Sequence, residues 1–494
     1  MLSILLVANC KTKMKNQIKI IAGHFLKTAI RSKALVAVYI VWLSLVLYAA
    51  FTGYKTYTTQ NALRQQFQQQ ARQSWEANPD KHPHRMAHFG TFAFRLKHPL
   101  SMFDYGMESY TGNAVFLEAH KQNTVNFSEA GFSTGLLRFG EISLSMLIQI
   151  LLPLILFFLG FNAVAQQKEN GTLKILLSQG AGFRSIIWGH SLGLFILSVL
   201  FLLPVVLVAV LQLSLQPVLP ADGFAGLRSV YLLLVCLAYL WLVSTVAICI
   251  SASSNSGHAA LLKLLGIWLV MAVVLPKTLQ AIGSALHPAP GKIEFDTAVE
   301  EDILKIGDSH NPNDPHFKRL KDSVLKANGV DSVNQLSFNY GGFQMREGER
   351  LSAEVYDNHL QQLYNLYEKQ NNVSTYSAFI DPLIGIRNIS MALSGTDFKA
   401  YRYFQNNAEV YRYGLAQTMN ELQMEHISNI KPSGDDKPQS IGRAHWKEFP
   451  DFQYTHQSLS SIVQQQQLAI VALFTWFVLS FALIYFTART AKAL

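Results

Sequence analysis

QQKENGTLKILL, residues 166–177, is a polar stretch between two long apolar runs. One run, residues 142–165, leads into it, and the other, residues 186–213, leads away. Crossing the hydrocarbon core of a bilayer takes about 20 apolar residues, and both runs are long enough. A short charged segment joined to two membrane spans therefore lies at the membrane surface, where another protein can contact it. This pattern predicts a transmembrane subunit moved by a partner.

The composition agrees with a membrane protein. Of the 494 residues, 50% are hydrophobic and 15% are charged, whereas soluble domains carry about 25% charged residues. Apolar runs predict six transmembrane helices, and none has a charge near its centre, where insertion is costly. Their predicted bounds are 34–54, 141–165, 186–213, 227–251, 258–277 and 467–488.

Lysine and arginine placement predicts the orientation. The N-terminal arm, residues 1–33, is basic and has no acidic residue, and the segment 166–185 and the tail are also basic. Basic loops stay in the cytoplasm, so we expect both termini there, in a bacterial inner membrane. The net charge of +9 is thereby explained as a topology signal that contacts membrane lipid, with no nucleic acid as partner.

Two outward segments, residues 55–140 and 278–466, are too long to be connectors. The glutamine-rich stretch 61–77 predicts a helix that extends the first span, and 78–100 predicts loop with short strands. In the second insert, helical spacing predicts one long helix around 351–367 and another over 401–427. The fold class is therefore an all-α polytopic membrane protein, with a mainly helical extracytoplasmic domain formed by the two inserts.

Motifs for independent catalysis are missing from the sequence. It contains no GxxxxGK[ST] phosphate loop, HExxH motif or CxxC pair, and GxSxG occurs only as GFSTG (131–135) in an insert and GHSLG (189–193) in an apolar span. We therefore predict no catalytic residue and no cofactor bound by this chain, so any energy must come from a partner.

Within the segment 166–185, the residue types suit a surface helix. Gly171 permits a sharp change in chain direction, and Thr172 is expected to cap the helix that starts there. Leu173 begins an apolar face, whereas Lys168 and Glu169 are expected to stay in water. A helix of this kind could also simply lie in the headgroup layer.

An E-x-G-T-L helix after the second of six spans, continuing LLSQGAGFRSIIWGHSLG (176–193), resembles the permeases of type 2 ABC transporters. The inserts resemble the branch with large extracytoplasmic inserts, related to gliding-motility and copper-processing permeases. That similarity rests on AHFGTFAF (87–94), FDYGMESYTG (103–112), VFLEAHKQN (115–123) and ISMALSGTDF (389–398).

The resemblance implies that residues 166–185 form a coupling helix, which docks on a separate ABC ATPase subunit that uses ATP and Mg. It also implies a second permease subunit, identical or related. Glu169 matches the coupling acid, while Gln167 and Lys168 stand where relatives often have arginine. The ATPase-coupling residues implied are Gln167, Lys168, Glu169, Gly171, Thr172 and Leu173.

Histidines gather in HPHRMAH, residues 82–88, and His98 and His120 follow. Histidine is a plausible ligand for soft or borderline metals. With no cysteine in the inserts, we predict that these histidines pack and hydrogen-bond in an ordinary fold and that the chain has no metal site. His82, His84 and His88 are the candidates for one. Glu118 and His120 could form an acid–base pair, but a structural hydrogen bond is the expected role.

The functional prediction is a permease subunit that couples hydrolysis by the ATPase to export or mechanical work. The alternatives are a non-transporting membrane anchor of an envelope machine, and a membrane enzyme built on the histidines and acids of the inserts.

Overall fold

The computed structural model describes residues 2–124, 142–215, 225–430 and 439–490. Parts of both predicted inserts, 125–140 and 431–438, and the first residue of the predicted second span lie outside the described residues. The described part is mainly helical, with one two-stranded sheet, which confirms the predicted fold class.

Six described helices are long and apolar enough to cross a membrane, so the chain is a multi-pass membrane protein. They agree with the predicted spans to within a few residues at most ends, except that the first and fifth continue well beyond the predicted spans. The helices of the membrane part are α1 (Leu2–Arg31), α2 (Lys33–Glu76), α5 (Leu144–Met146), η3 (Leu147–Leu151), α6 (Leu152–Gly160), α7 (Asn162–Glu169), α8 (Thr172–Ser178), α9 (Phe183–Ser214), α10 (Ala225–Ser253), α11 (Gly257–Leu269), η4 (Val270–Val274), α12 (Leu275–Leu286) and α19 (Gln467–Thr490).

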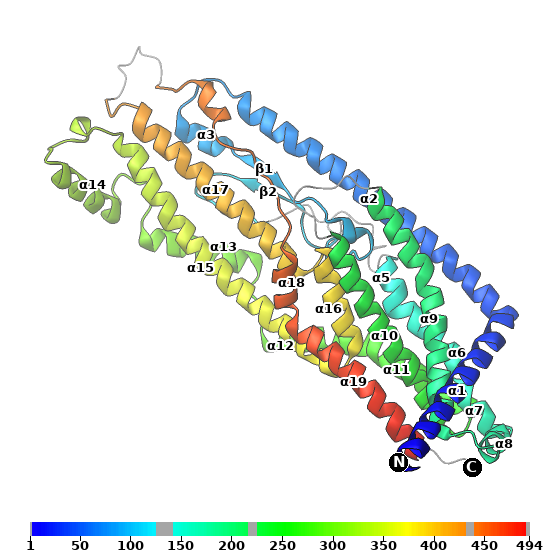
Figure 1. Cartoon of the computed structure of the whole chain (residues 1–494). Helices are drawn as coiled ribbons and strands as arrows, with labels where there is room; N and C mark the ends of the chain where they lie inside the picture. Colours follow the sequence, from blue (N-terminus) through cyan, green and yellow to red (C-terminus); the bar gives the residue numbers. More distant parts are fainter. Residues whose placement is uncertain (1, 125–141, 216–224, 431–438, 491–494) are drawn as a thin grey trace.

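Residues 55–124, 287–430 and 439–466 form a second part, here called the insert domain. Figure 1 shows most of it beyond the end of the membrane helices that is opposite α8 and both termini, whereas residues 377–394 lie beside α10 and α19. Its elements are α3 (Pro83–Phe89), β1 (Thr91–Phe94), η1 (Pro99–Met102), β2 (Ala114–Leu117), α13 (Lys292–Ile306), α14 (Pro315–Asn328), η5 (Val333–Gln335), α15 (Tyr340–Tyr376), η6 (Ser377–Phe379), α16 (Pro382–Ser394), α17 (Phe398–His426), η7 (Arg443–Lys447) and α18 (Leu459–Gln465).

α2 belongs to both parts of the molecule, because the first span continues without a break into the insert domain (Figure 1). At its far end the indole of Trp75 donates to the carbonyl of Trp446 at 2.9 Å, and both side chains are buried. The glutamine-rich stretch is thus helical, as its composition predicts.

The N-terminal arm is a helix, α1, which the sequence interpretation did not foresee. It packs along the start of α9, where glycines allow close approach: a Cβ on Gly189 would meet Ile21 at 2.6 Å. Isoleucine and phenylalanine at positions 18, 21 and 25 have helical spacing and form the packed face.

In the insert domain α15 and α17 pack side by side, as Figure 1 shows, and the antiparallel strands β1 and β2 lie against α2 and α17. The aromatic side chains of α17 pack in this core: Phe404 is fully buried, and Tyr411 contacts Phe449 and Phe452. Residues 83–89 form the helix α3, so the prediction of loop with short strands over 78–100 was right for β1 and wrong for α3.

Candidate functional site

The second membrane helix is interrupted at Phe161, between α6 and α7, and a serine of α10 closes the interruption. Ser251 Oγ accepts the backbone N–H groups of Val164 and Ala165, each at 3.1 Å, and donates to the carbonyl of Phe161 at 2.6 Å. Ser251 is fully buried. Because lipid offers no hydrogen bonds, a break in a membrane helix needs such an internal partner.

α7 is held against the fourth and fifth spans by two further contacts. Asn162 lies so close to Gly257 of α11 that a Cβ there would meet its Oδ1 at 1.9 Å. The Lys168 ammonium donates to the carbonyl of Ala252 at the end of α10. Lys168 therefore does not stay in water as expected, because its long side chain reaches an unsatisfied carbonyl of a neighbouring helix.

Gln167 connects α7 to the third span and to α1. Its amide Nε2 lies 3.3 Å from Nε2 of His190, whose Nδ1 donates to the carbonyl of Ile186 at 2.8 Å. The His190 ring also packs edge-on against Phe25 of α1, with ring centroids 5.8 Å apart. Through Gln167 and His190, α7 is therefore connected to both α9 and α1.

The turn between α7 and α8 depends on Gly171, whose φ of 75° lies in the left-handed region. This agrees with the expected change of direction. The helix cap differs from the prediction: the side chain of Asn170 accepts the Thr172 N–H at 3.1 Å and its hydroxyl at 2.6 Å. Thr172 is the first residue of α8, so it cannot cap that helix; Gly171 is at the N-cap position, and the side-chain oxygen of Asn170 accepts the first N–H group of the helix.

α8 is anchored on one side and open on the other. Leu173 is buried in the hydrophobic core formed by the membrane helices, whereas Glu169 and Lys174 are exposed and Ile175 is 58% exposed. Beyond α8, Gln17 of α1 donates to the carbonyl of Gly180 at 2.9 Å. The loop into α9 is thus clamped by α1, and the exposed side chains form a rigid surface, here called the α8 surface: Glu169, Thr172, Lys174, Ile175 and Ser178.

Substituting Ser251 tests the closure of the helix break. Ser251→Ala leaves two buried N–H groups without an acceptor, so we expect a loss of about 1–3 kcal/mol of stability. The measurement is thermal unfolding of the purified protein in detergent. Ser229→Ala is the matched control, because that hydroxyl only bonds to a carbonyl of its own helix α10; equal melting temperatures for both variants would contradict the assigned role.

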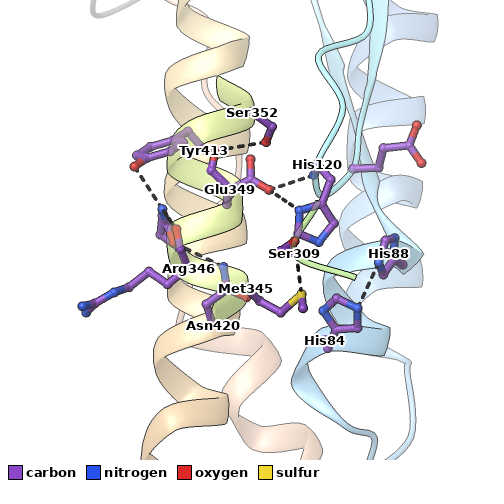
Figure 2. A network of polar contacts seen from close by, with 12 residues as sticks. His84, His88, His120, Ser309, Met345, Arg346, Glu349, Ser352, Tyr413 and Asn420 are labelled. Carbon is purple, nitrogen blue, oxygen red and sulfur yellow. Dashed lines mark hydrogen bonds and ion pairs between the residues drawn. The ribbon is translucent and has the colours of Figure 1, made fainter. Parts of the chain in front are cut away.

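A second constellation lies in the insert domain, where four histidines meet. His84 and His88 stand one turn apart on α3, His120 follows β2, and His310 lies in the loop between α13 and α14. One ring nitrogen from each lies within 4.8 Å of those of the other three. Figure 2 shows His84, His88 and His120 converging beside α15.

The polypeptide around these histidines fixes their positions. Met86 and Ala87 of α3 are buried against α17, which leaves His84 and His88 on the other face. The turn after β2 is tied to α3 by a hydrogen bond from Ala119 N to the carbonyl of Ala87 at 3.3 Å. His120 itself has a φ of 64°, unusual for a residue other than glycine.

His310 is placed by a close approach of its loop to α15. A Cβ on Gly348 would meet the Ser309 side chain at 2.4 Å, so only glycine leaves room there. The Ser309 hydroxyl lies 3.9 Å from the sulfur of Met345, as Figure 2 shows.

Carboxylates hold the outer nitrogens of two of the rings. Glu349 Oε2 accepts the backbone N–H of His120 at 2.8 Å and lies 3.1 Å from its Nδ1 (Figure 2). Asp308 Oδ1 accepts the backbone N–H of His310 at 2.8 Å and lies 3.6 Å from its Nδ1. With Nδ1 directed at a carboxylate, Nε2 of each ring is left to face the cluster. The acid partner of His120 is Glu349, whereas Glu118 accepts from Asn123.

Burial and neighbouring histidines lower the pKa of His84, His88 and His310 and so favour their neutral forms. Burial and then the neighbouring histidines lower the pKa of His84 to about 3, and burial with His120 and His310 lowers that of His88. Burial followed by His120 likewise lowers the pKa of His310. Neutral imidazole is the form that binds metals.

Glu349 stays ionised although it is fully buried. Burial raises its pKa, but the hydrogen bond from His120 and the charge of Arg412 outweigh this and lower it to about 2. Arg412 lies 2.6 Å from Glu349 and 2.7 Å from Glu409. Because the folded pKa lies below the ordinary 4.5, this carboxylate stabilises the fold above about pH 4.5, and the contribution is lost as the pH falls through about 2.

Of the candidate ligands proposed from the sequence, the structure brings His84 and His88 together and places His82 elsewhere. His82 caps α3, its Nδ1 accepting the His84 N–H at 3.2 Å. The sequence interpretation noted His120 without grouping it and missed His310. The spacing of four between His84 and His88 was the available signal, and no local pattern connects His310 to them.

Comparison with known proteins identifies one region. A family profile described as "Domain of unknown function (DUF3526)" matches residues 292–455, most of the second insert. Comparison with curated proteins found no match. The matched region contains His310, Glu349 and Arg412, whereas His84, His88 and His120 precede it. The histidine cluster therefore joins the matched region to the first insert.

Substituting Arg412 tests the buried network. Arg412→Met removes the cation from the fully buried Glu349 and from Glu409, whose side chain is 14% exposed, so we expect destabilisation of about 3–5 kcal/mol, read as a lower melting temperature. Arg350→Met is the control, because that arginine also pairs with two glutamates but is half exposed, where such pairs contribute about 0–1 kcal/mol. Similar effects of both substitutions would refute the importance of burial.

Proposed function

We propose that this chain is the permease subunit of a type 2 ABC transporter, which couples ATP hydrolysis by a separate ATPase subunit to export or mechanical work across a bacterial inner membrane. The observation that carries the proposal is the construction of α7 and α8. A short exposed helix lies between the second and third spans, and the residues on either side of it, from Phe161 to Gly180, bond to three other helices of the membrane part.

This construction suits the transmission of force. A partner that presses on the α8 surface meets a segment held by Ser251, Gln167 and Gln17, so the force reaches α10, α9 and α1. A helix that merely lay in the headgroup layer would need no such contacts. The mixture of Glu169, Lys174 and the exposed Ile175 offers both charge and apolar area to a docking protein.

A second permease subunit is the other partner in the proposal. The fifth span, Gly257–Leu286, is the least covered of the six candidate spans. Large apolar side chains on it are exposed, among them Leu262 at 74% and Leu269 at 50%. Membrane lipid or a second subunit can cover them, and the resemblance to type 2 permeases favours a subunit at this helix.

Motion has two routes to the insert domain. α2 is continuous from the first span to Trp75, and α12, which continues the fifth span, packs on α15. Where α12 packs on α15, Gly283 lies against the backbone of Gln370, whose side chain donates to the carbonyl of His287 at 2.6 Å. These connections support mechanical work on the insert domain as part of the function.

Docking of the ATPase is tested on the α8 surface. The chain is purified from its native host, and captured proteins with a Walker A loop are identified by mass spectrometry. We expect Ile175→Asp to weaken capture about tenfold or more, a loss of about 1.4 kcal/mol of binding, because it places a charge in an apolar contact. Lys326→Glu, an exposed change on α14 in the insert domain, is the control and should not alter capture.

The proposal fails if no ATPase is captured, or if Ile175→Asp and the control behave alike. Glu169→Ala separates transport from simple anchoring: in a coupled machine it changes the ATP hydrolysis rate of the reconstituted complex while the ATPase stays bound. An unchanged rate favours the non-transporting anchor.

Orientation is tested by labelling single cysteines with a membrane-impermeant maleimide, in a chain whose native cysteines are serine. We expect Asn328→Cys on α14 to react in intact spheroplasts, and Ser178→Cys on α8 to react only after lysis; both positions are exposed. The reverse pattern would place α8 outside, where no cytosolic ATPase can reach it.

A further inference from the structure

The rings of four histidines of the insert domain all lie close to one another. The ring centroids of all six pairs lie between 4.7 Å, for His84 and His88, and 6.4 Å, for His88 and His310. No acidic residue belongs to this group of ligand atoms among the described residues.

We propose that His84, His88, His120 and His310 bind one divalent transition-metal ion through their imidazole nitrogens, and that this ion is zinc. Imidazole suits zinc, copper and nickel, whereas calcium and magnesium require oxygen ligands. The filled d shell of zinc imposes no geometry, and structural zinc sites are almost always tetrahedral with four ligands, which suits rings tilted against one another at many angles.

The distances permit this coordination after small ring rotations. At a zinc–nitrogen length of 2.0–2.1 Å, the nitrogens of a tetrahedral site are about 3.3 Å apart. The Nε2 atoms of His84 and His88 already lie 3.2 Å apart, and no pair of ligand atoms exceeds 4.8 Å. Both His88 and His310 are exposed, so an ion can enter from solvent.

The surroundings of the rings have the form found around metal sites. A histidine that binds a metal through one nitrogen usually donates the other N–H to a carboxylate or carbonyl, which orients the ring. Glu349 stands in this position for His120 and Asp308 for His310. His120 Nε2 is buried and has no hydrogen-bond partner in the described part of the chain. A bound ion would be the missing partner of this nitrogen.

The ion would connect the two inserts. Three ligands come from residues 84–120 and one from the loop at His310, in the region matched by the family profile. Zinc would thus fix that loop and α15 against α3. This inference does not depend on the proposed transport function, because it concerns only the insert domain.

The test is zinc binding by the full-length protein, purified in detergent through a tag without histidine. Metal content is measured by inductively coupled plasma mass spectrometry, and after chelation Zn²⁺ is titrated in competition with a chromophoric chelator. We expect about one zinc per chain, and a loss of affinity of at least 100-fold for His120→Ala and for His310→Ala. Asp308→Asn, which alters only the orienting carboxylate, should weaken binding about 10–100-fold.

His82→Asn is the matched control, because asparagine can still cap α3 and His82 is not in the cluster. It should bind zinc like the wild type. Zinc should raise the melting temperature of the wild type and of this control but not of His310→Ala, and the metal-free melting temperatures show whether each variant is folded.

The proposal is overturned if the folded wild type binds no zinc at micromolar concentration, or if His82→Asn loses affinity as much as His120→Ala. Retention of copper in place of zinc by protein purified from native membranes would overturn the choice of ion.

Discussion

The membrane part depends on how the break in the second span is satisfied. Within lipid, backbone N–H and carbonyl groups must find partners inside the protein, and a helix that ends at Phe161 leaves such groups free. One hydroxyl, that of Ser251, meets three of them. The second span can therefore continue past this interruption through α7 while α7 stays bonded to α10.

The insert domain has a comparable centre in Glu349. A buried carboxylate is unfavourable unless it is paired, and here it is paired with Arg412 and with two N–H groups of His120. These bonds join α15, α17 and the turn after β2. They also direct the His120 ring toward the other three histidines, so the same contacts that stabilise the fold arrange the cluster.

The sequence allowed much of this to be predicted, for physical reasons. Membrane spans follow from hydropathy alone, and the left-handed turn at Gly171 follows from the conformational freedom of glycine. Short-range details were less accessible: Thr172 is the first residue of α8 and not its cap, and its N–H is accepted by the side chain of Asn170. α3 was missed because residues 78–100 were predicted as loop with short strands, although Pro83 in the first turn is typical of a helix start. His310 and Glu349 could not be connected with His120, because that contact exists only after α13 and α15 have packed against the first insert.

The unbroken course of α2 has a geometric consequence. At 1.5 Å per residue, its 44 residues form a rod about 66 Å long, anchored among the membrane helices at one end and at Trp446 at the other. A rigid rod amplifies rotation into displacement, so tilting it by about 5° shifts its tip by roughly 6 Å. A small rearrangement at the membrane end of α2 can in this way move its other end, near Trp446, by about the length of a side chain.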